Sequence, residues 1–245
     1  MKALIIIPTY NERENMEPLV EQIQIHAKGH DSSILIVDSN SPDGTGQVAD
    51  QLKKRHPNLY VFHQPKKLGL GKAYIDGLRW ALNWKCDAIV TMDADFSHDP
   101  SYIPQMLGLL ANYDFIIGSR HTAGGKVVNW PIYRTILSKC ANFYARTLIG
   151  MPLNDLTNAY QCFHHRFLPI LLEPELRSTG YAFLIEFKLR FVERDARIVE
   201  IPIIFRDRTK GESKVSKRVI FESMLRVWQY AAERRLRQIK EMRRH

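Results

Sequence analysis

Short apolar segments alternate with segments of helical periodicity throughout the first half of this 245-residue chain. We predict strands at 3–8, 33–38, 59–63, 88–93 and 115–118, with helices near 13–28, 44–56, 71–85 and 100–111 between them. Strands that pair in parallel need a crossover connection, which is usually a helix, so this alternation is typical of βαβ units. The pattern therefore predicts an α/β, Rossmann-like fold with a mostly parallel sheet and flanking helices.

Two short signals refine the predicted turns. Asn11 followed by Glu14 resembles a capping box, which would open the first helix. Asp43 and Gly44 are turn residues and are expected to close the turn after the second strand.

The second half of the chain is less regular. We predict a helix over 131–149, starting near Pro131, and a second helix over 182–194. A strand or β-ribbon over 197–205 is followed by a final helix from about 216 to 241. The helix over 131–149 carries an apolar stripe, which predicts a buried face: Tyr133, Ile136, Leu137, Cys140, Tyr144 and Leu148.

Composition limits the class of protein. A hydrophobic fraction of 45% and a charged fraction of 25% are globular averages and argue against disorder. The three cysteines are far apart and lack metal-site spacing, so a reducing compartment without disulfides is expected. The first apolar run is too short for a signal peptide, and no run approaches about 18 apolar residues. We therefore expect a cytoplasmic protein, either free or peripheral on a membrane.

The positive charge is concentrated at the end of the chain. The formal net charge is +9, and residues 206–245 contain 13 Lys/Arg against 5 Asp/Glu. Such a segment fits nucleic acid, anionic lipid, a phosphorylated substrate or a solvated helix face. Composition alone leaves these four open.

Polar side chains follow the predicted strands, at the edge of the sheet where ligands of open α/β folds bind. Asp93 and Asp95 come directly after the fourth strand, where two carboxylates can bind one hard divalent cation. An isolated pair of this kind is more often a solvated turn, whereas this strand order favours a metal site. The glycine-containing segment 66–72 fits no Walker loop, and is either an anion-binding helix start or a plain turn.

Several motifs together resemble family 2 glycosyltransferases of the GT-A fold, and more narrowly dolichol-phosphate mannose synthases and related polyprenyl-phosphate sugar transferases. The motifs are Pro8-Thr9-Tyr10-Asn11-Glu12, Val37-Asp38, Ser41-Pro42-Asp43-Gly44-Thr45, Lys67-Leu68-Gly69-Leu70-Gly71, Asp93-Ala94-Asp95-Phe96-Ser97-His98-Asp99-Pro100 and Gly118-Ser119-Arg120. Asp155-Leu156-Thr157, Gly180-Tyr181-Ala182-Phe183 with Glu186, and Asp207-Arg208 with Gly211-Glu212-Ser213-Lys214 extend the resemblance to about residue 215.

The resemblance implies the roles of individual residues. The nucleotide-sugar site would comprise Pro8, Tyr10, Glu12, Val37, Asp38, Asp43, Lys67, Gly71, Asp93 and Ala94. Asp93 and Asp95 would hold Mg²⁺ or Mn²⁺, with Asp95 also catalytic. Arg120, Arg134 and Ser138 would receive the acceptor phosphate, because guanidinium groups match phosphate geometry. Arg208 and Lys214 would close over the phosphates.

The implied activity is transfer of mannose from GDP-mannose to a polyprenyl phosphate of the dolichol type, with inversion at the anomeric carbon. UDP-glucose or another donor, a noncatalytic paralogue and, more remotely, a nucleic-acid-binding protein are the alternatives. The resemblance favours the enzyme and no nucleic-acid partner, since a strand-end acidic pair would repel a phosphate backbone without a metal.

The sequence departs from the family pattern at several positions. Ser39 stands where a second aspartate is usual, which leaves the donor base open. Residues 158–161 read Asn-Ala-Tyr-Gln where Gly-Gly-Phe-Arg is frequent, and His164 and His165 follow them. Leu184 replaces a frequent Gln, and Ser97 stands where some relatives have a metal-ligating Gln.

We divide the chain into a catalytic domain at 1–215 and a basic amphipathic helix at 216–245. Within the domain, 1–120 would bind the nucleotide-sugar and 121–215 the acceptor. The basic helix would lie on an anionic membrane surface at the cytoplasmic face, inserting Trp228 or Phe221, unless these aromatic residues face the core. A membrane-anchoring partner protein is a further possibility.

Overall fold

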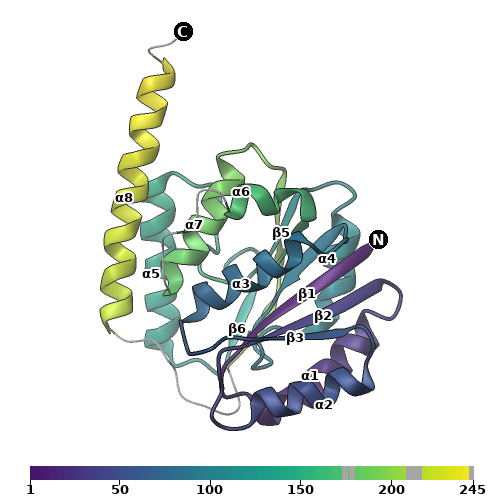
Figure 1. Cartoon of the computed structure of the whole chain (residues 1–245). Coiled ribbons are helices and arrows are strands. Elements are labelled where there is room, and N and C mark those ends of the chain that lie inside the picture. The colour runs from purple at the N-terminus through teal and green to yellow at the C-terminus, as the bar shows by residue number, and fades with distance from the viewer. Residues whose placement is uncertain (173–175, 177–179, 208–216, 243–245) are drawn as a thin grey trace.

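The computed structural model describes residues 1–172, 176, 180–207 and 217–242 (Figure 1). Within these residues, a seven-stranded sheet has the order β3-β2-β1-β4-β7-β5-β8, and β6 pairs with β9 separately. The strands are β1 Lys2–Thr9, β2 Asp31–Asp38, β3 Leu59–His63, β4 Ala88–Thr91, β5 Phe115–Ser119, β6 Lys126–Val128, β7 Gln161–His164, β8 Ile198–Pro202 and β9 Ile204–Arg206. The predicted α/β class with a mostly parallel sheet is confirmed.

The centre of the sheet is apolar on both faces. β1 pairs in parallel with β2 and with β4, so that Ile6 lies between Leu35 and Thr91. Residues 3–7 of β1 are completely buried, as expected for a parallel strand covered by helices on each side. β7 is the antiparallel member and lies between β4 and β5.

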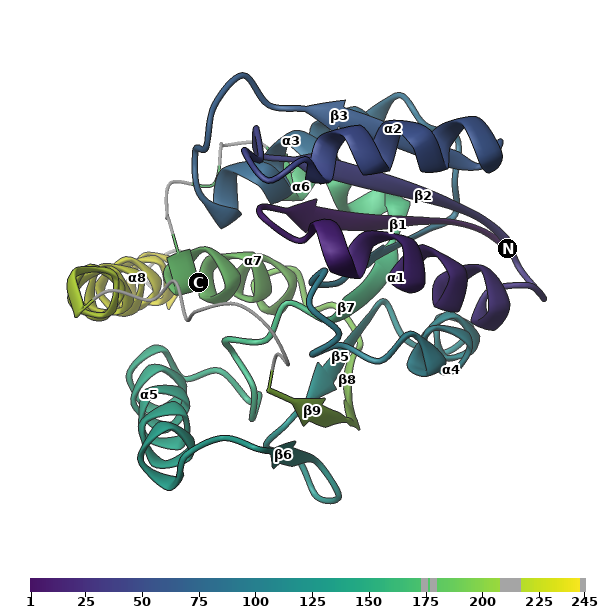
Figure 2. The same cartoon turned by 90° about the horizontal axis from the view of Figure 1, so that it is seen from below.

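Helices cover both faces of the sheet. Ile5 and Ile7 pack with α1, α2 and α4, whereas Leu4 and Ile6 pack with α3 and α7 on the other face. Figure 2 shows α5 and α8 at one side of the molecule, away from α1 and α2. The helices are α1 Arg13–His26, α2 Thr45–Arg55, α3 Leu70–Leu82, α4 Ile103–Leu109, α5 Ile132–Ile149, α6 Leu168–Leu172, α7 Gly180–Val192 and α8 Lys217–Met242, with 3-10 turns at Pro100–Tyr102 and His165–Phe167.

The two predicted turn signals have different outcomes. Asp43 accepts hydrogen bonds from the Thr45 backbone and hydroxyl, and Gly44 has φ 92°, so the predicted turn is confirmed. The predicted capping box is wrong. The N-cap of α1 is Glu12 and has no side-chain capping bond, while Asn11 lies one residue earlier at φ 57°. Asn tolerates this left-handed conformation, which explains its place in the turn.

Among the described residues of the second half, β6, β7 and α6 are elements that sequence periodicity did not indicate. They are only three to five residues long, too short to show a period. The predicted strand or ribbon at 197–205 divides into two strands. β8 joins the large sheet beside β5, and β9 pairs with β6.

The apolar stripe of α5 is the main correction to the predicted core. The helix is present, but most of the stripe is open to solvent: Tyr133 is 72% exposed, and Ile136, Leu137 and Cys140 are also exposed. Tyr144 and Leu148 do pack against the core. Periodicity indicates that a helix has an apolar face, but not what covers it.

The final helix, α8, packs on α5 and α7. Val227, Tyr230 and Ala231 are buried, and the Tyr230 hydroxyl donates to Glu186 at 2.7 Å. Trp228 is 58% exposed, so it does not face the core. The Phe221 side chain lies outside the described residues. No helix in the described part of the chain is long and apolar enough to cross a membrane.

The cysteines agree with the expectation of a disulfide-free protein. Cys86, Cys140 and Cys162 are all free, and Cys162 is buried. Burial raises the pKa of the Cys86 thiol to about 11, so this thiol is protonated at neutral pH.

Candidate active site

The turns after β1 and β2 are joined into one surface at the edge of the sheet. The Ser41 hydroxyl accepts from the Asn11 N–H, and the Thr45 hydroxyl accepts from the Glu12 N–H. Asp43 also accepts from the Arg13 N–H at 3.2 Å. Residues 30 or more positions apart are thereby held in one place, beside the carboxyl ends of two parallel strands.

The predicted nucleotide-sugar residues gather around these turns. Pro8 and Val37 are register partners in the paired strands β1 and β2. Asp38 is buried and accepts from the Ser41 hydroxyl and N–H. Lys67 places its ammonium 3.8 Å from the centre of the Tyr10 ring. The structure therefore brings together residues from four separate predicted motifs.

Two glycines beside this surface lie where a side chain would crowd a neighbour, more severely at Gly46 than at Gly71. A Cβ on Gly46 would come within 2.8 Å of the Asp38 carboxylate. A Cβ on Gly71 would come within 3.2 Å of Phe183, so the absence of a side chain at Gly71 allows α3 and α7 to pack closely there. The Gly71 contact explains the glycine before Lys72 by packing.

Asp93 and Asp95 follow β4, as predicted, and Ala94 separates them. The Tyr74 hydroxyl donates to Asp93 Oδ1 at 3.0 Å, and Ser97 donates through its hydroxyl and N–H to Asp95 Oδ1. Burial and the two nearby carboxylates raise the pKa of Tyr74 well above its usual value, so it stays a donor. Tyr74 was missed in the sequence, because it occupies an ordinary apolar position of α3.

The chemistry of this donor set fits a hard divalent cation. Each aspartate supplies carboxylate oxygens, and one oxygen of each is oriented by a neighbouring hydroxyl. Within the described residues, no group of three or more His, Cys, Asp or Glu forms a metal site. A cation held by two carboxylates would have other coordination positions left for phosphate oxygens and water.

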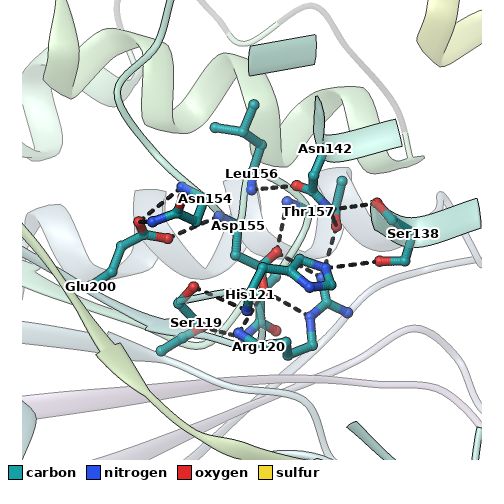
Figure 3. A network of polar contacts seen from close by, with 12 residues as sticks. Ser119, Arg120, His121, Ser138, Asn142, Asn154, Asp155, Leu156, Thr157 and Glu200 are labelled. Carbon is teal, nitrogen blue, oxygen red and sulfur yellow. Dashed lines mark hydrogen bonds and ion pairs between the residues drawn. The ribbon is translucent and has the colours of Figure 1, made fainter. Parts of the chain in front are cut away.

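The region predicted to bind the acceptor, called the acceptor side below, is built around a buried ion pair, shown in Figure 3. Arg120 donates through Nε and Nη2 to the two carboxylate oxygens of Asp155, each at 2.7 Å, and through Nη2 to the Thr157 hydroxyl. Burial alone would raise the pKa of Asp155, but the Arg120 charge and hydrogen bonds hold it far below its usual value. Arg120 is thus committed to the loop over 154–158.

Arg134 and Ser138 lie on α5, one helical turn apart. Arg134 pairs with Asp207 at 3.1 Å and stacks 4.1 Å from the Trp130 ring centre. Ser138 Oγ lies 3.1 Å from His121 Nε2. Burial lowers the pKa of His121, which favours its neutral form. The Arg134 guanidinium is about a quarter exposed, so it is more open to an incoming anion than Arg120 is.

The loop over 154–158 is held from three further directions. Glu200 accepts from the N–H groups of Asn154 and Asp155, and Asn142 accepts from the Leu156 N–H (Figure 3). Lys188, which is completely buried, donates to the carbonyls of residues 156 and 158. Burial lowers the pKa of Lys188 to about 7. Sequence reasoning did not assign Asn142, Lys188 or Glu200, since each contact spans at least 14 residues.

Two predicted site residues cannot be placed. Arg208 and Lys214 lie outside the described residues.

The fold is shared with solved nucleotide-sugar enzymes. A crystal structure of glucosyl-3-phosphoglycerate synthase from Mycobacterium tuberculosis, in complex with Mn²⁺, uridine diphosphate and phosphoglyceric acid, has a TM-score of 0.68. That match covers 92% of this chain and 78% of that chain at 17% identity, so it concerns the fold alone. The family model described as glycosyl transferase family 2 matches residues 4–168, and the chain belongs to this family.

Named relatives are more specific. The chain is 39% identical to undecaprenyl-phosphate mannosyltransferase of Micrococcus luteus, over 95% of this chain and 96% of that protein. It is 40% identical to polyprenol monophosphomannose synthase of Mycolicibacterium smegmatis, over 96% and 89% respectively. It is 36% identical to dolichol-phosphate mannosyltransferase of Pyrococcus furiosus, over 93% of this chain and 63% of that protein. The resemblance identified from the sequence motifs is confirmed.

Proposed function

We propose that this glycosyltransferase moves mannose from GDP-mannose to a polyprenyl phosphate, giving a lipid-phosphate mannose. The observation that carries the proposal is the position of the acidic turn after β4 beside the turn after β5, which the Arg120–Asp155 ion pair holds in place. Asp93 and Asp95 follow β4, Arg120 follows β5, and the start of β7 lies between them. The three relatives above are named for mannose transfer to such lipids or for polyprenol monophosphomannose synthesis.

Asp93 and Asp95 would hold Mg²⁺ or Mn²⁺, which when bound neutralises charge on the departing diphosphate. The donor would occupy the surface formed by Pro8, Tyr10, Glu12, Val37, Asp38, Asp43, Lys67, Gly71 and Ala94. Lys67 lies over Tyr10 and can contact a phosphate from there. Arg208 and Lys214 remain proposed to close over the phosphates.

The acceptor phosphate would bind to Arg134 and Ser138 on α5, while Arg120 keeps the loop over 154–158 in place. A phosphate is already anionic at neutral pH, so attack on the anomeric carbon needs positioning more than a strong general base. In-line attack opposite the nucleotide inverts that carbon and yields a β-linked product from an α-linked donor. Proton NMR of the product tests this, and an α linkage would contradict it.

The test of function uses purified protein with Mg²⁺, a polyprenyl phosphate and a panel of radiolabelled sugar nucleotides. We expect label from GDP-mannose in the lipid fraction, and none from UDP-glucose. Asp95→Asn should lower the rate by roughly a thousandfold, since it weakens the metal site. Asp31→Asn, at the exposed start of β2, is the matched control and should retain the rate. Transfer from UDP-glucose alone would replace the proposed donor, and no transfer from any donor would favour a noncatalytic sugar-nucleotide binder.

We further propose that the protein acts on an anionic membrane surface, through α5 together with the basic segment 216–245. The exposed apolar face of α5 supports this, because contiguous exposed apolar side chains mark interaction surfaces. α5 also carries Arg and Lys but no Asp or Glu, which suits anionic lipid. The face comprises Ile132, Tyr133, Ile136, Leu137 and Phe143. Such attachment would place the enzyme at the cytoplasmic face of a membrane, with or without an anchoring partner protein.

Vesicle co-sedimentation tests the membrane contact. The double variant Ile136→Ser/Leu137→Ser should lose most binding to vesicles containing anionic lipid at low salt. Leu82→Ser, which alters an exposed leucine at the end of α3, is the matched control and should bind like the wild type. Wild-type protein that stays in the supernatant would contradict the membrane contact, while leaving transfer to a short-chain acceptor in detergent unaffected.

A further inference from the structure

His98 joins the acidic turn after β4 to the acceptor-side loop. The His98 ring is completely buried and is stacked on Tyr160 with ring centres 4.9 Å apart. The Asp93 N–H donates to His98 Nδ1 at 2.9 Å, whereas the Asp93 carboxylate is 3.9 Å from the same nitrogen. The shorter contact makes Nδ1 an acceptor, which assigns the ring proton to Nε2.

Asn158 continues this connection. His98 Nε2 faces Asn158 Oδ1 at 2.7 Å and therefore donates to it. Asn158 Nδ2 in turn donates to the Gly118 carbonyl, and the Asn158 carbonyl accepts from Lys188 Nζ. One His tautomer and one amide orientation satisfy all of these bonds. The turn after β4 is thus tied, through Asn158, to the last residues of β5.

We infer that the bridge between His98 and Asn158 positions Asp93 for the divalent cation, so that the acceptor-side loop helps to build the donor-side metal site. The inference rests on the metal site of the proposed function. Tyr74 orients one carboxylate oxygen of Asp93, and His98 fixes the Asp93 backbone. Without the bridge, the His98 ring is no longer held in one orientation, and its hydrogen bond with the Asp93 N–H is weakened. His98 and Asn158 are positioning residues, because they act through Asp93.

Asn158 is one of the positions at which the sequence departs from the family pattern. A glycine, which is frequent there, has no side chain to accept from His98. Loss of the bridge can therefore be tested at residue 158 without touching any proposed metal ligand.

The experiment measures Mn²⁺ affinity by electron paramagnetic resonance, with GDP or with UDP and without any acceptor. Asn158→Ala should weaken Mn²⁺ binding about tenfold, the effect of one lost buried hydrogen bond. Asn142→Ala is the matched control, since Asn142 holds the same loop through Leu156 and Thr157 (Figure 3). It does not belong to the bridge and should leave Mn²⁺ affinity within about twofold.

A double-mutant cycle separates the bridge from general loosening of the site. Asn at position 98 can still accept from the Asp93 N–H, but is too short to reach Asn158. His98→Asn should therefore also weaken Mn²⁺ binding about tenfold. The double variant with Asn158→Ala should remain near tenfold rather than near a hundredfold, because both changes remove the same bond.

Circular dichroism tests whether each variant is folded. If Asn158→Ala does not fold, Asn158→Ser replaces it. Equal Mn²⁺ affinity in the wild type and the folded position-158 variant would overturn the inference but not the proposed function. Independent, multiplying effects in the cycle would also overturn it. If the wild type fails to bind Mn²⁺ both in the presence of GDP and in the presence of UDP, the metal site and the bridge are both overturned.

Discussion

The turns predicted to bind the donor (the donor side) and the loop over 154–158 on the predicted acceptor side differ in the sequence separation of the contacts that hold them. Around the donor site, many side-chain contacts are local: Asp38 with Ser41, Asp43 with Thr45, and Asp95 with Ser97 span two or three residues. On the acceptor side, the contact between Arg120 and Asp155 spans 35 residues, and that between Glu200 and Asn154 spans 46. Local contacts can be recognised as motifs, whereas distant ones need the folded chain.

The two regions also differ in how their charges are used. Asp155 and Arg120 side chains are 0% and 5% exposed and neutralise each other. The Asp93 side chain is 31% exposed, and Arg134 and Asp207 are 25% and 23% exposed. Buried paired charges fix structure, while partly exposed charges can exchange a protein partner for a ligand. The acceptor side therefore has one structural arginine and one that is suited to binding.

The largest expected contrast is between Asp155→Ala and Asp95→Ala. Removing Asp155 leaves Arg120 buried without its partner, which should lower the free energy of unfolding by about 3–5 kcal/mol. Asp95→Ala should change it by about 1 kcal/mol or less, yet abolish transfer. Urea denaturation followed by tryptophan fluorescence measures the free energy of unfolding of both variants, and the radiolabel assay measures their transfer. Similar stability of the two variants would contradict the distinction between the regions.

Arg134→Ala should raise the KM for polyprenyl phosphate by roughly 10- to 100-fold, the usual effect of losing a charge-assisted hydrogen bond. The KM for the donor should stay within about twofold, because Arg134 lies on α5 and pairs with Asp207 rather than with the donor-side turns. Arg55→Ala is the control, because Arg55 of α2 forms an exposed ion pair with Glu17 of α1 and lies outside the proposed site. An unchanged acceptor KM would return the phosphate-binding role to Arg120.

Lys188 gives the acceptor side a pH dependence. Its pKa is about 7 in the folded protein, because burial disfavours the charge, and about 10.4 in an unfolded chain. Between these values the unfolded chain binds one more proton, so stability rises with pH. Relative to Lys188→Met, the wild type should gain roughly 2 kcal/mol between pH 7 and pH 9. Denaturation curves of both proteins at pH 6, 7.5 and 9 measure this difference. A difference in stability that stays the same at all three pH values would contradict a buried lysine that titrates near pH 7.

Asp43 provides the smallest expected effect, on the donor side. Burial by itself would raise the pKa of Asp43, but the hydrogen bonds from Thr45 and Arg13 lower the pKa by more, so the net shift is downward. Its stabilisation is therefore complete above the usual pKa near 3.9 and is lost as pH falls through the lower folded value. Asp43→Ala should cost about 1 kcal/mol at pH 7, as for a helix cap. Thermal unfolding at pH 7 and pH 2.5 should show the difference shrinking; a constant difference would refute this role.

Most of the fold was predictable, because it depends on repeated local patterns. The first five strands and four helices come from apolar runs and helical periodicity, and the donor turns come from motifs that close within a few residues. The exposed face of α5 shows the limit of this reasoning. The same spacing that predicts burial in a helix such as α3 leaves Ile136 and Leu137 exposed, because no other element among the described residues covers them.

The sequence by itself determined the parallel sheet, the acidic pair after β4 and the family, since each is written in neighbouring residues. The tertiary structure alone decided that Arg120 is locked to Asp155, that Lys188 is buried beneath the acceptor loop, and that His98 reaches Asn158. The physical reason is chain connectivity. Side chains 30 to 60 residues apart meet when strands order themselves in a sheet, and no local pattern records that order.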